Sequence, residues 1–229
     1  MAWFNFLGKN SNDFDIVVEK YPQFYIPVKS FDKVTIAGND KAEYRQGTYE
    51  PIILSFECYI KDRTPSKIRE VSRWLNSNTE GKLIRGDDEE VYYNARVVNA
   101  IPISKVAKSF GRFIIQFECE PFAYKLNDEV ITITSNTEIE NLGIAEAKPI
   151  YKVYGSGEAK IKVNGSEVTL YGVGNYIEID TDLMECYKDN VSMNTSMSGN
   201  YTALWLKEGI NTIEITGASK IEIIPKWRY

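Results

Sequence analysis

The stretch from Phe117 to Tyr124 constrains the fold most strongly, because one alternating β pattern ends there and a second begins shortly after it. The odd-numbered residues from 113 to 119 are apolar and their neighbours are mostly polar, which is the period of a half-buried strand. Pro121 lacks the N–H group that a strand interior requires, so we expect the strand to end before it. A polar segment, 125–129, then leads to a new alternating run at 130–133.

The break predicts two domains, residues 1–126 and 127–229. The chain has 229 residues, of which 43% are hydrophobic and 26% charged, and this length can bury a substantial core. The N-terminal stretch lacks the basic start and the long apolar run of a signal peptide, and no later run has the length of a membrane span. We therefore expect a folded, non-membrane protein made in a cytoplasm, with Cys58, Cys119 and Cys186 as reduced thiols.

The chain contains no histidine, which excludes Ser-His-Asp and Cys-His nucleophile systems and histidine-based metal sites. Carboxylate-pair chemistry of the glycosidase type survives as a weak alternative, with six candidate residues: Asp87, Asp88, Glu89, Glu90, Asp180 and Asp182. The residues 86–90 are better explained as a charged hairpin turn, and Asp180 as the end of a strand. We expect no enzyme activity, no metal and no cofactor.

A formal net charge of −5 argues against a dedicated nucleic-acid binder, which needs a basic stripe to displace phosphate counterions. The glycine pairs Gly155–Gly157 and Gly172–Gly174 superficially resemble phosphate-binding loops, but strand-like runs and not helices follow them. We therefore predict that both pairs are turns.

The first domain has one clear helical pattern. Thr64 is the expected N-cap and Pro65 the first helical residue, and an apolar face formed by Ile68, Val71, Trp74 and Leu75 follows. The helix is expected to end near 76–78 and to pack against a sheet or sandwich that includes the alternating strand 52–60. The predicted class of this domain is α+β, and that of the whole chain mainly β.

The second domain reads as all-β. Asn164-Gly165 predicts a tight primed hairpin turn, and residues 214–221 read as a second hairpin. No helical period of useful length follows Tyr124. The polar stretch 189–200 is interpreted as a long loop, either a docking loop or a plain connector. We expect a β-sandwich or jelly roll.

Motifs spread over nearly the full length resemble those of the distal tail protein (Dit) family of long-tailed phages and prophages, in its short form. The family's G-[RN]-[DN] turn is similar to residues 38–40, and its F-x-C-x-P-F ending is similar to residues 117–122. The remaining matches, in order along the chain, are residues 11–19, 34–37, 47–50, 74–76, 82–84, 92–93, 141–143, 147–150, 152–157, 206–211 and 225–229.

The resemblance implies a structural protein without catalysis. Six copies would form a ring through domain 1–126, with 127–229 as a peripheral galectin-like or carbohydrate-module-like sandwich. The ring would join the end of the tail tube to the tail-tip hub, support receptor-binding proteins, and let DNA pass through its lumen without specific binding. The expected location is the virion tail tip, after synthesis in the bacterial host cytoplasm.

The loop 38–47 is the candidate for contact with a neighbouring subunit, since it offers few apolar residues to its own domain but carries aromatic rings. The residues proposed for this role are Asn39, Asp40, Tyr44, Arg45 and Tyr49. An ordinary solvated hairpin tip explains the same residues equally well.

A binding module for host cell-wall glycan, without catalysis, is the alternative function. Tyr201 and Trp205 would stack on sugar rings. Trp205 lies between Leu204 and Leu206, so strand alternation would expose it on the opposite face. Packing under a loop is the competing explanation.

Overall fold

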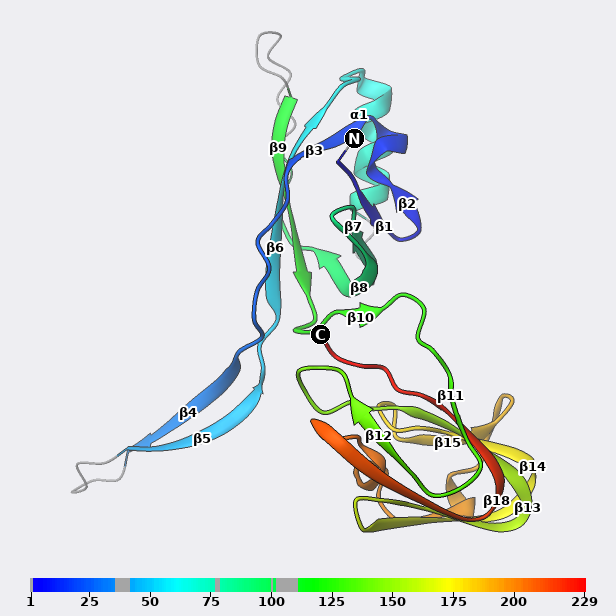
Figure 1. The fold of residues 1–229 in the computed structure, drawn as a ribbon. Helices are drawn as coiled ribbons and strands as arrows, with labels where there is room; N and C mark the ends of the chain where they lie inside the picture. The colour runs from blue at the N-terminus through cyan, green and yellow to red at the C-terminus, as the bar shows by residue number, and fades with distance from the viewer. Residues whose placement is uncertain (1, 36–41, 77–78, 100, 102–110) are drawn as a thin grey trace. The chain divides into compact units, whose positions relative to one another are not determined.

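A computed structural model describes residues 2–35, 42–76, 79–99, 101 and 111–229 of the chain (Figure 1). These residues divide into two compact units, Met1–Leu126 and Asn127–Tyr229. Both are dominated by antiparallel strands, and the described residues contain one α-helix, which confirms the predicted mainly β class. No helix among them has the length and apolar character needed to cross a membrane.

The N-terminal unit is built on one antiparallel sheet in the order β2-β1-β7-β8-β9-β6-β3, with β10 beside β8. Its strands are β1 (Phe4–Phe6), β2 (Lys9–Asn10), β3 (Ile16–Lys20), β6 (Ile52–Ile60), β7 (Gly81–Arg85), β8 (Asp88–Val97), β9 (Gly111–Cys119) and β10 (Tyr124–Lys125). The Val18 amide of β3 also donates to the Ala2 carbonyl, just before β1, at 3.2 Å. The sheet therefore curls until its two ends approach each other.

The helix α1 (Pro65–Leu75) begins and ends as predicted. Thr64 Oγ1 accepts a hydrogen bond from the Lys67 amide, and Pro65 occupies the first turn, where its missing N–H costs nothing. Trp74 is buried, stacks on Phe14 with ring centroids 4.2 Å apart, and donates its Nε1–H to the Phe6 carbonyl at 3.0 Å. The helix thus covers one face of the curled sheet.

The core of this unit follows the alternation seen in the sequence. The inward-facing residues of β6 and β9 are buried from Leu54 to Ile60 and from Phe113 to Cys119. The β9 strand ends at Cys119, before Pro121, as expected. The segment after it is not a free linker, however, because β10 pairs with Tyr92 and Val91 of β8. The boundary between units therefore lies beyond Tyr124, after Leu126.

A two-stranded ribbon, β4 (Lys29–Thr35) and β5 (Ala42–Tyr49), is inserted between β3 and β6 and forms a sheet of its own (Figure 1). The loop at its tip, residues 36–41, lies outside the described residues.

The C-terminal unit is a sandwich dominated by three long antiparallel strands, β13 (Ile150–Val163), β14 (Ser166–Asp180) and β18 (Gly209–Ile224). Short strands extend it on both sides in the order β11-β18-β13-β14-β15-β16, with β12 beside β18 and β17 beside β14. These are β11 (Ile131–Ile133), β12 (Thr137–Asn141), β15 (Glu185–Lys188), β16 (Val191–Ser192) and β17 (Met197–Ser198). Figure 1 shows the long strands bending sharply.

Glycines lie where the long strands bend, and here two predictions are wrong. Gly155–Gly157 and Gly172–Gly174 are not turns: they pair with each other inside β13 and β14. Residues 217–219 are likewise part of a continuous β18 and not a hairpin turn. Gly217 has φ +73°, and a Cβ there would lie 2.2 Å from the Glu158 carbonyl oxygen, so no other residue fits without a shift. The three segments form a glycine crease across the sheet.

The crease lets both halves of each long strand cover one core. Tyr151 and Val153 before the crease, and Ile161 and Val163 after it, belong to the same buried cluster. The Asn164-Gly165 hairpin joins β13 to β14 as predicted, with φ of 49° and 86° at the two turn residues.

The stretch 189–200 is more ordered than the predicted long loop. It contains β16, the 3₁₀ helix η2 (Asn194–Ser196) and β17. Asn194 Oδ1 accepts a hydrogen bond from the Cys186 amide at 2.6 Å, which fixes the stretch to β15.

Candidate functional site

The ribbon β4–β5 has two chemically different faces. Lys33 lies directly opposite Tyr44, and Asp32 opposite Arg45, so these pairs occupy opposite faces. Phe31 shares the face of Lys33 because it is two residues away. Phe31 is 57% and Tyr44 65% exposed. We call Phe31, Lys33 and Tyr44 the aromatic face of the ribbon.

The five residues predicted to contact a neighbouring subunit therefore do not all lie on one surface. Tyr44 lies on the aromatic face and Arg45 on the charged face, while Asn39 and Asp40 lie outside the described residues. Tyr49 packs edge-on against Phe122 of its own unit, with ring centroids 4.6 Å apart, and Lys29 Nζ lies 4.9 Å from its ring centroid. Tyr49 therefore anchors the ribbon base, and Tyr44 is the better candidate for contact with a neighbour.

An exposed apolar segment leads into the ribbon, and the sequence analysis missed it. Phe24, Tyr25, Ile26 and Val28 are each more than half exposed and belong to no strand. The sequence does contain a signal for this exposed segment, which is an apolar run between Pro22 and Pro27. The two prolines prevent regular strand pairing there.

A buried arginine fixes the start of this segment. Arg85, 2% exposed, donates from Nη2 to the Pro22 carbonyl at 2.9 Å, and its guanidinium lies 4.1 Å from the Phe24 ring centroid. Asp87 accepts from both Nε and Nη2, at 2.9 and 2.7 Å. A bidentate carboxylate offsets much of the cost of burying the charge. Asp87 is thus a structural partner of Arg85.

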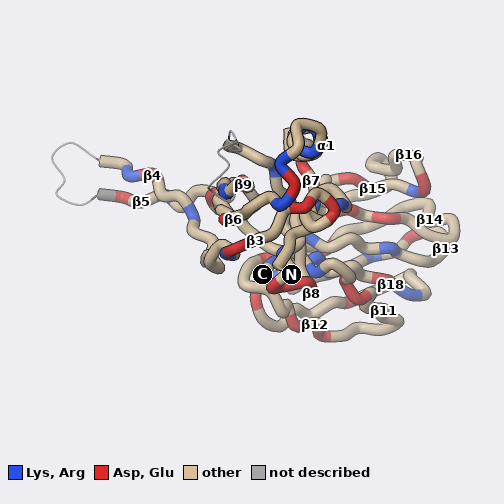
Figure 2. The backbone as a smooth tube through the Cα atoms, turned by 90° about the horizontal axis from the view of Figure 1, so that it is seen from above, with Lys and Arg blue, Asp and Glu red and all other residues tan. Residues whose placement is uncertain are grey.

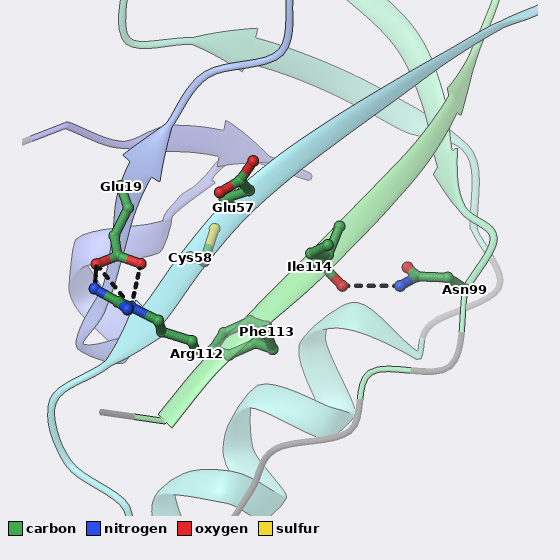
Figure 3. Close-up of a pocket in the computed structure, with 7 residues that line it drawn as sticks. All are labelled: Glu19, Glu57, Cys58, Asn99, Arg112, Phe113 and Ile114. Carbon is green, nitrogen blue, oxygen red and sulfur yellow. Dashed lines mark hydrogen bonds and ion pairs between the residues drawn. The ribbon is translucent and has the colours of Figure 1, made fainter. Parts of the chain in front are cut away.

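A groove lies on the outer face of β3, β6 and β9, away from the ribbon (Figure 3). It encloses about 440 Å³ and is lined by Glu19, Glu57, Cys58, Asn99, Arg112, Phe113 and Ile114. Arg112 Nε lies 2.8 Å from Glu19 Oε2, forming an ion pair across the rim. Ile114 is 48% exposed, and its carbonyl accepts a hydrogen bond from Asn99 Nδ2 at 2.8 Å.

The one thiol in the groove wall is not a reactive group. Burial, with a smaller contribution from the Glu19 carboxylate, raises the pKa of Cys58 to about 12. The thiolate, which is the nucleophilic form, is therefore scarce at neutral pH. With two carboxylates, one guanidinium and the exposed Ile114, the groove is suited to binding a cationic and apolar surface.

Two of the other carboxylates that the sequence singled out, Asp180 and Asp182, have structural partners. Asp180 is 4% exposed, its Oδ1 accepts from the amides of Asp182 and Leu183, and Lys226 Nζ lies 3.3 Å from its Oδ2. Lys148 Nζ pairs with Asp182 at 2.6 Å. No group of three or more metal-ligating side chains occurs among the residues that the structure describes. Figure 2 shows that basic and acidic residues are interspersed along the strands of the C-terminal unit.

The candidate sugar contacts are both partly buried. Tyr201, in η3 (Tyr201–Leu204), packs against the sandwich core and hydrogen-bonds through its hydroxyl to Asn194 Oδ1 at 3.0 Å. Trp205 donates Nε1–H to the Thr181 carbonyl at 3.3 Å, and Lys148 Nζ lies 5.2 Å from its ring centroid. Leu204 and Leu206 are buried, as the alternation predicted. The two rings thus have different hydrogen-bond partners.

Comparison with known proteins finds similarity to phage and prophage proteins. Residues 9–119 match the model of the phage tail protein RIFT-related domain family. The SPbeta prophage-derived uncharacterized protein YomH of Bacillus subtilis (strain 168) is 25% identical over 205 residues, covering 79% of this chain and 77% of YomH.

Two kinds of solved structure share the fold. The crystal structure of SPP1 Dit (gp 19.1), described as a paradigm of the hub adsorption apparatus in Gram-positive infecting phages, has a TM-score of 0.76 and 16% identity, with 97% of each chain covered. A chain of the phage P2 baseplate in its activated conformation with Ca has a TM-score of 0.55 and 12% identity, with 100% of this chain and 99% of that chain covered. Residues 9–119 thus match a phage tail protein family, a prophage-derived protein is similar over most of the chain, and the fold is shared with SPP1 Dit, which together support a structural protein of a phage tail.

Proposed function

We propose that six copies of this chain form a ring that joins the end of the tail tube to the tail-tip hub and supports receptor-binding proteins. The observation that carries this proposal is the fold shared with SPP1 Dit over 97% of both chains. Residues 1–126 form the ring, and residues 127–229 form the sandwich at its periphery. The partners are other copies of the chain, the tail tube protein, the hub protein and a receptor-binding protein, and no catalytic step is involved.

The exposed side chains of the N-terminal unit support self-assembly. A lone subunit would leave the aromatic face of the ribbon and the apolar segment 24–28 in water, although such surface is more stable when buried against a partner. The C-terminal unit also exposes apolar side chains, among them Tyr171, Leu183 and Ile210, but the N-terminal unit gathers several exposed aromatic rings in the segment 24–28 and on the ribbon. The N-terminal unit is therefore the natural site of the ring contact.

The ring would enclose a lumen through which DNA passes without specific binding. The net charge of −5 supports this, because like charges repel the phosphate backbone. If charges mapped on an assembled ring made the lumen strongly basic, DNA would be retained and this part of the proposal would be wrong. We also propose that the chain is made in the host cytoplasm before it joins the virion.

Mass measurement of the purified chain tests the ring. Light scattering of the chain alone should give six times the 26.2 kDa chain mass, and a chain that assembles only with a partner should give a larger complex containing six copies after addition of the tail tube protein or of the hub protein. A strict monomer under all three conditions would contradict the proposal. Titration calorimetry with host cell-wall polysaccharide is the second test: we expect no heat, and saturable heat lost in Trp205→Ala would favour the glycan-binding alternative.

A further inference from the structure

A closed ring of identical subunits needs two different surfaces on each copy, one that enters a neighbour and one that receives it, because the same patch meeting itself gives only a dimer. The N-terminal unit has two suitable surfaces among its described residues. The first is the aromatic face of the ribbon, made of Phe31, Lys33 and Tyr44. The second is the groove over β3, β6 and β9 (Figure 3).

The two surfaces are complementary in character. The aromatic face presents two exposed rings beside one ammonium group. The groove presents the exposed Ile114 on β9 beside the carboxylate of Glu57, which lies directly opposite Ile114 in the strand register, and the carboxylate of Glu19 lies beyond it on β3. Its volume of about 440 Å³ is within the range of roughly 300–1,000 Å³ found for binding pockets.

Glu57 is available to a new partner. Among the residues that the structure describes, its ion-pair partner is Lys20, with Nζ at 3.4 Å, and both side chains are more than half exposed. An exposed pair of this kind contributes little stability, so exchanging Lys20 for the ammonium of a neighbour costs little. Glu19, in contrast, is held by Arg112 at 2.8 Å and shapes the rim.

The two surfaces also lie at opposite ends of one strand. The ribbon ends at Tyr49, next to the beginning of β6 at Ile52, whereas Glu57 and Cys58 lie near the end of β6. Six residues of strand span about 20 Å. A subunit built in this way can give the ribbon to one neighbour and offer the groove to the other.

We propose that the aromatic face of the ribbon of each subunit seats in the groove of the next, with Phe31 and Tyr44 packing on Ile114 and Lys33 pairing with Glu57. This inference rests on the proposed function, because it names the receiving surface of the ring contact. The groove is thus completed by side chains of a second copy of the chain.

Matched arginine substitutions test the groove. Ile114→Arg places a charge on the groove floor and should raise the protein concentration needed for half-assembly at least about tenfold by light scattering. Ile53→Arg is the control, because Ile53 is 40% exposed on the same sheet face but does not line the groove. Unchanged circular dichroism and melting in both variants verify that the subunit is folded.

A charge exchange tests the pairing. Lys33→Glu and Glu57→Lys should each weaken assembly, and the double variant should recover most of the loss. A disulfide test adds proximity: Tyr44→Cys with Ile114→Cys should give covalent oligomers on mild oxidation, and Tyr44→Cys with Ile53→Cys should give none. The three native thiols are buried and do not compete.

The outcomes distinguish failure of the groove as the receiving surface from failure of the ring itself. If the wild-type chain forms rings but Ile114→Arg assembles normally and the Tyr44–Ile114 pair does not cross-link, the groove is not the receiving surface and the ring proposal stands. If the wild-type chain remains a monomer with and without tail partners, both proposals fail.

Discussion

Strand β9 and the ribbon β4–β5 belong to the same unit and carry similar aromatic residues, yet these have opposite surroundings. Phe117 is fully buried and contacts the rings of Phe4, Phe6 and Phe56 at centroid distances of 5.0 to 5.6 Å. Tyr44 is 65% exposed on a strand that pairs only with β4. The difference separates residues that stabilise the subunit from residues that are available to a partner.

The largest expected effect is on the buried side of this comparison. Phe117→Ala removes a ring from the centre of the core and should lower the free energy of unfolding by about 3–5 kcal/mol through the cavity that remains. Denaturant melts followed by circular dichroism measure it. A loss below about 1 kcal/mol would mean that the surroundings collapse into the space, and the contrast with the ribbon would disappear.

Asp87→Ala tests the ion pair between Asp87 and the buried Arg85, which holds the start of the segment that leads into the ribbon. Without the carboxylate, Arg85 keeps a buried charge with one fewer partner, and we expect a loss of about 2 kcal/mol, less than for a fully buried pair because Asp87 is 29% exposed. Glu89→Ala, at an exposed position of the same turn region, is the control and should change stability by less than about 0.5 kcal/mol. Equal effects in the two variants would show that Arg85 does not depend on Asp87.

The buried thiols give the stability of the core a pH dependence. Burial raises the pKa of Cys58 and of Cys119 to about 12, from 9.0 in the unfolded chain. Above pH 9 the unfolded chain therefore loses protons that the folded core retains, so stability is complete below pH 9 and decreases from there towards pH 12. Between pH 8 and 10 each thiol should cost about 1 kcal/mol.

Urea melts of the wild type and of Cys58→Ala at the two pH values measure this contribution. The variant starts from a lower stability but should lose about 1 kcal/mol less on going to pH 10. The same decrease in both proteins would show that Cys58 ionises as readily in the folded core as in the unfolded chain.

The smallest effect on stability is expected for the ribbon. Tyr44→Ser removes an exposed ring and should change the free energy of unfolding by less than about 0.5 kcal/mol, while assembly is lost. Phe31→Ser should behave in the same way. A destabilised but fully assembled Tyr44→Ser protein would reverse the assignment of core and contact residues.

The body of the N-terminal unit was predictable because its signals are local. Alternation placed Phe117 and Cys119 inside, and Thr64-Pro65 marked the beginning of the helix. The two glycine pairs were misread because glycine inside an apolar pattern permits either a turn or a bend, and only pairing between distant segments decides between them. The groove was not predicted for the same reason: Glu19, Glu57 and Arg112 come from three separate strands.

The glycine crease has a consequence for how the sandwich comes apart. Since β13, β14 and β18 each run through both layers, neither layer can detach without breaking strands that the other layer shares. Hydrogen exchange in this unit should therefore occur through one opening event that exposes Val153 and Ile161 together, and not layer by layer. A domain with this property resists partial opening while a partner pulls on one side of it.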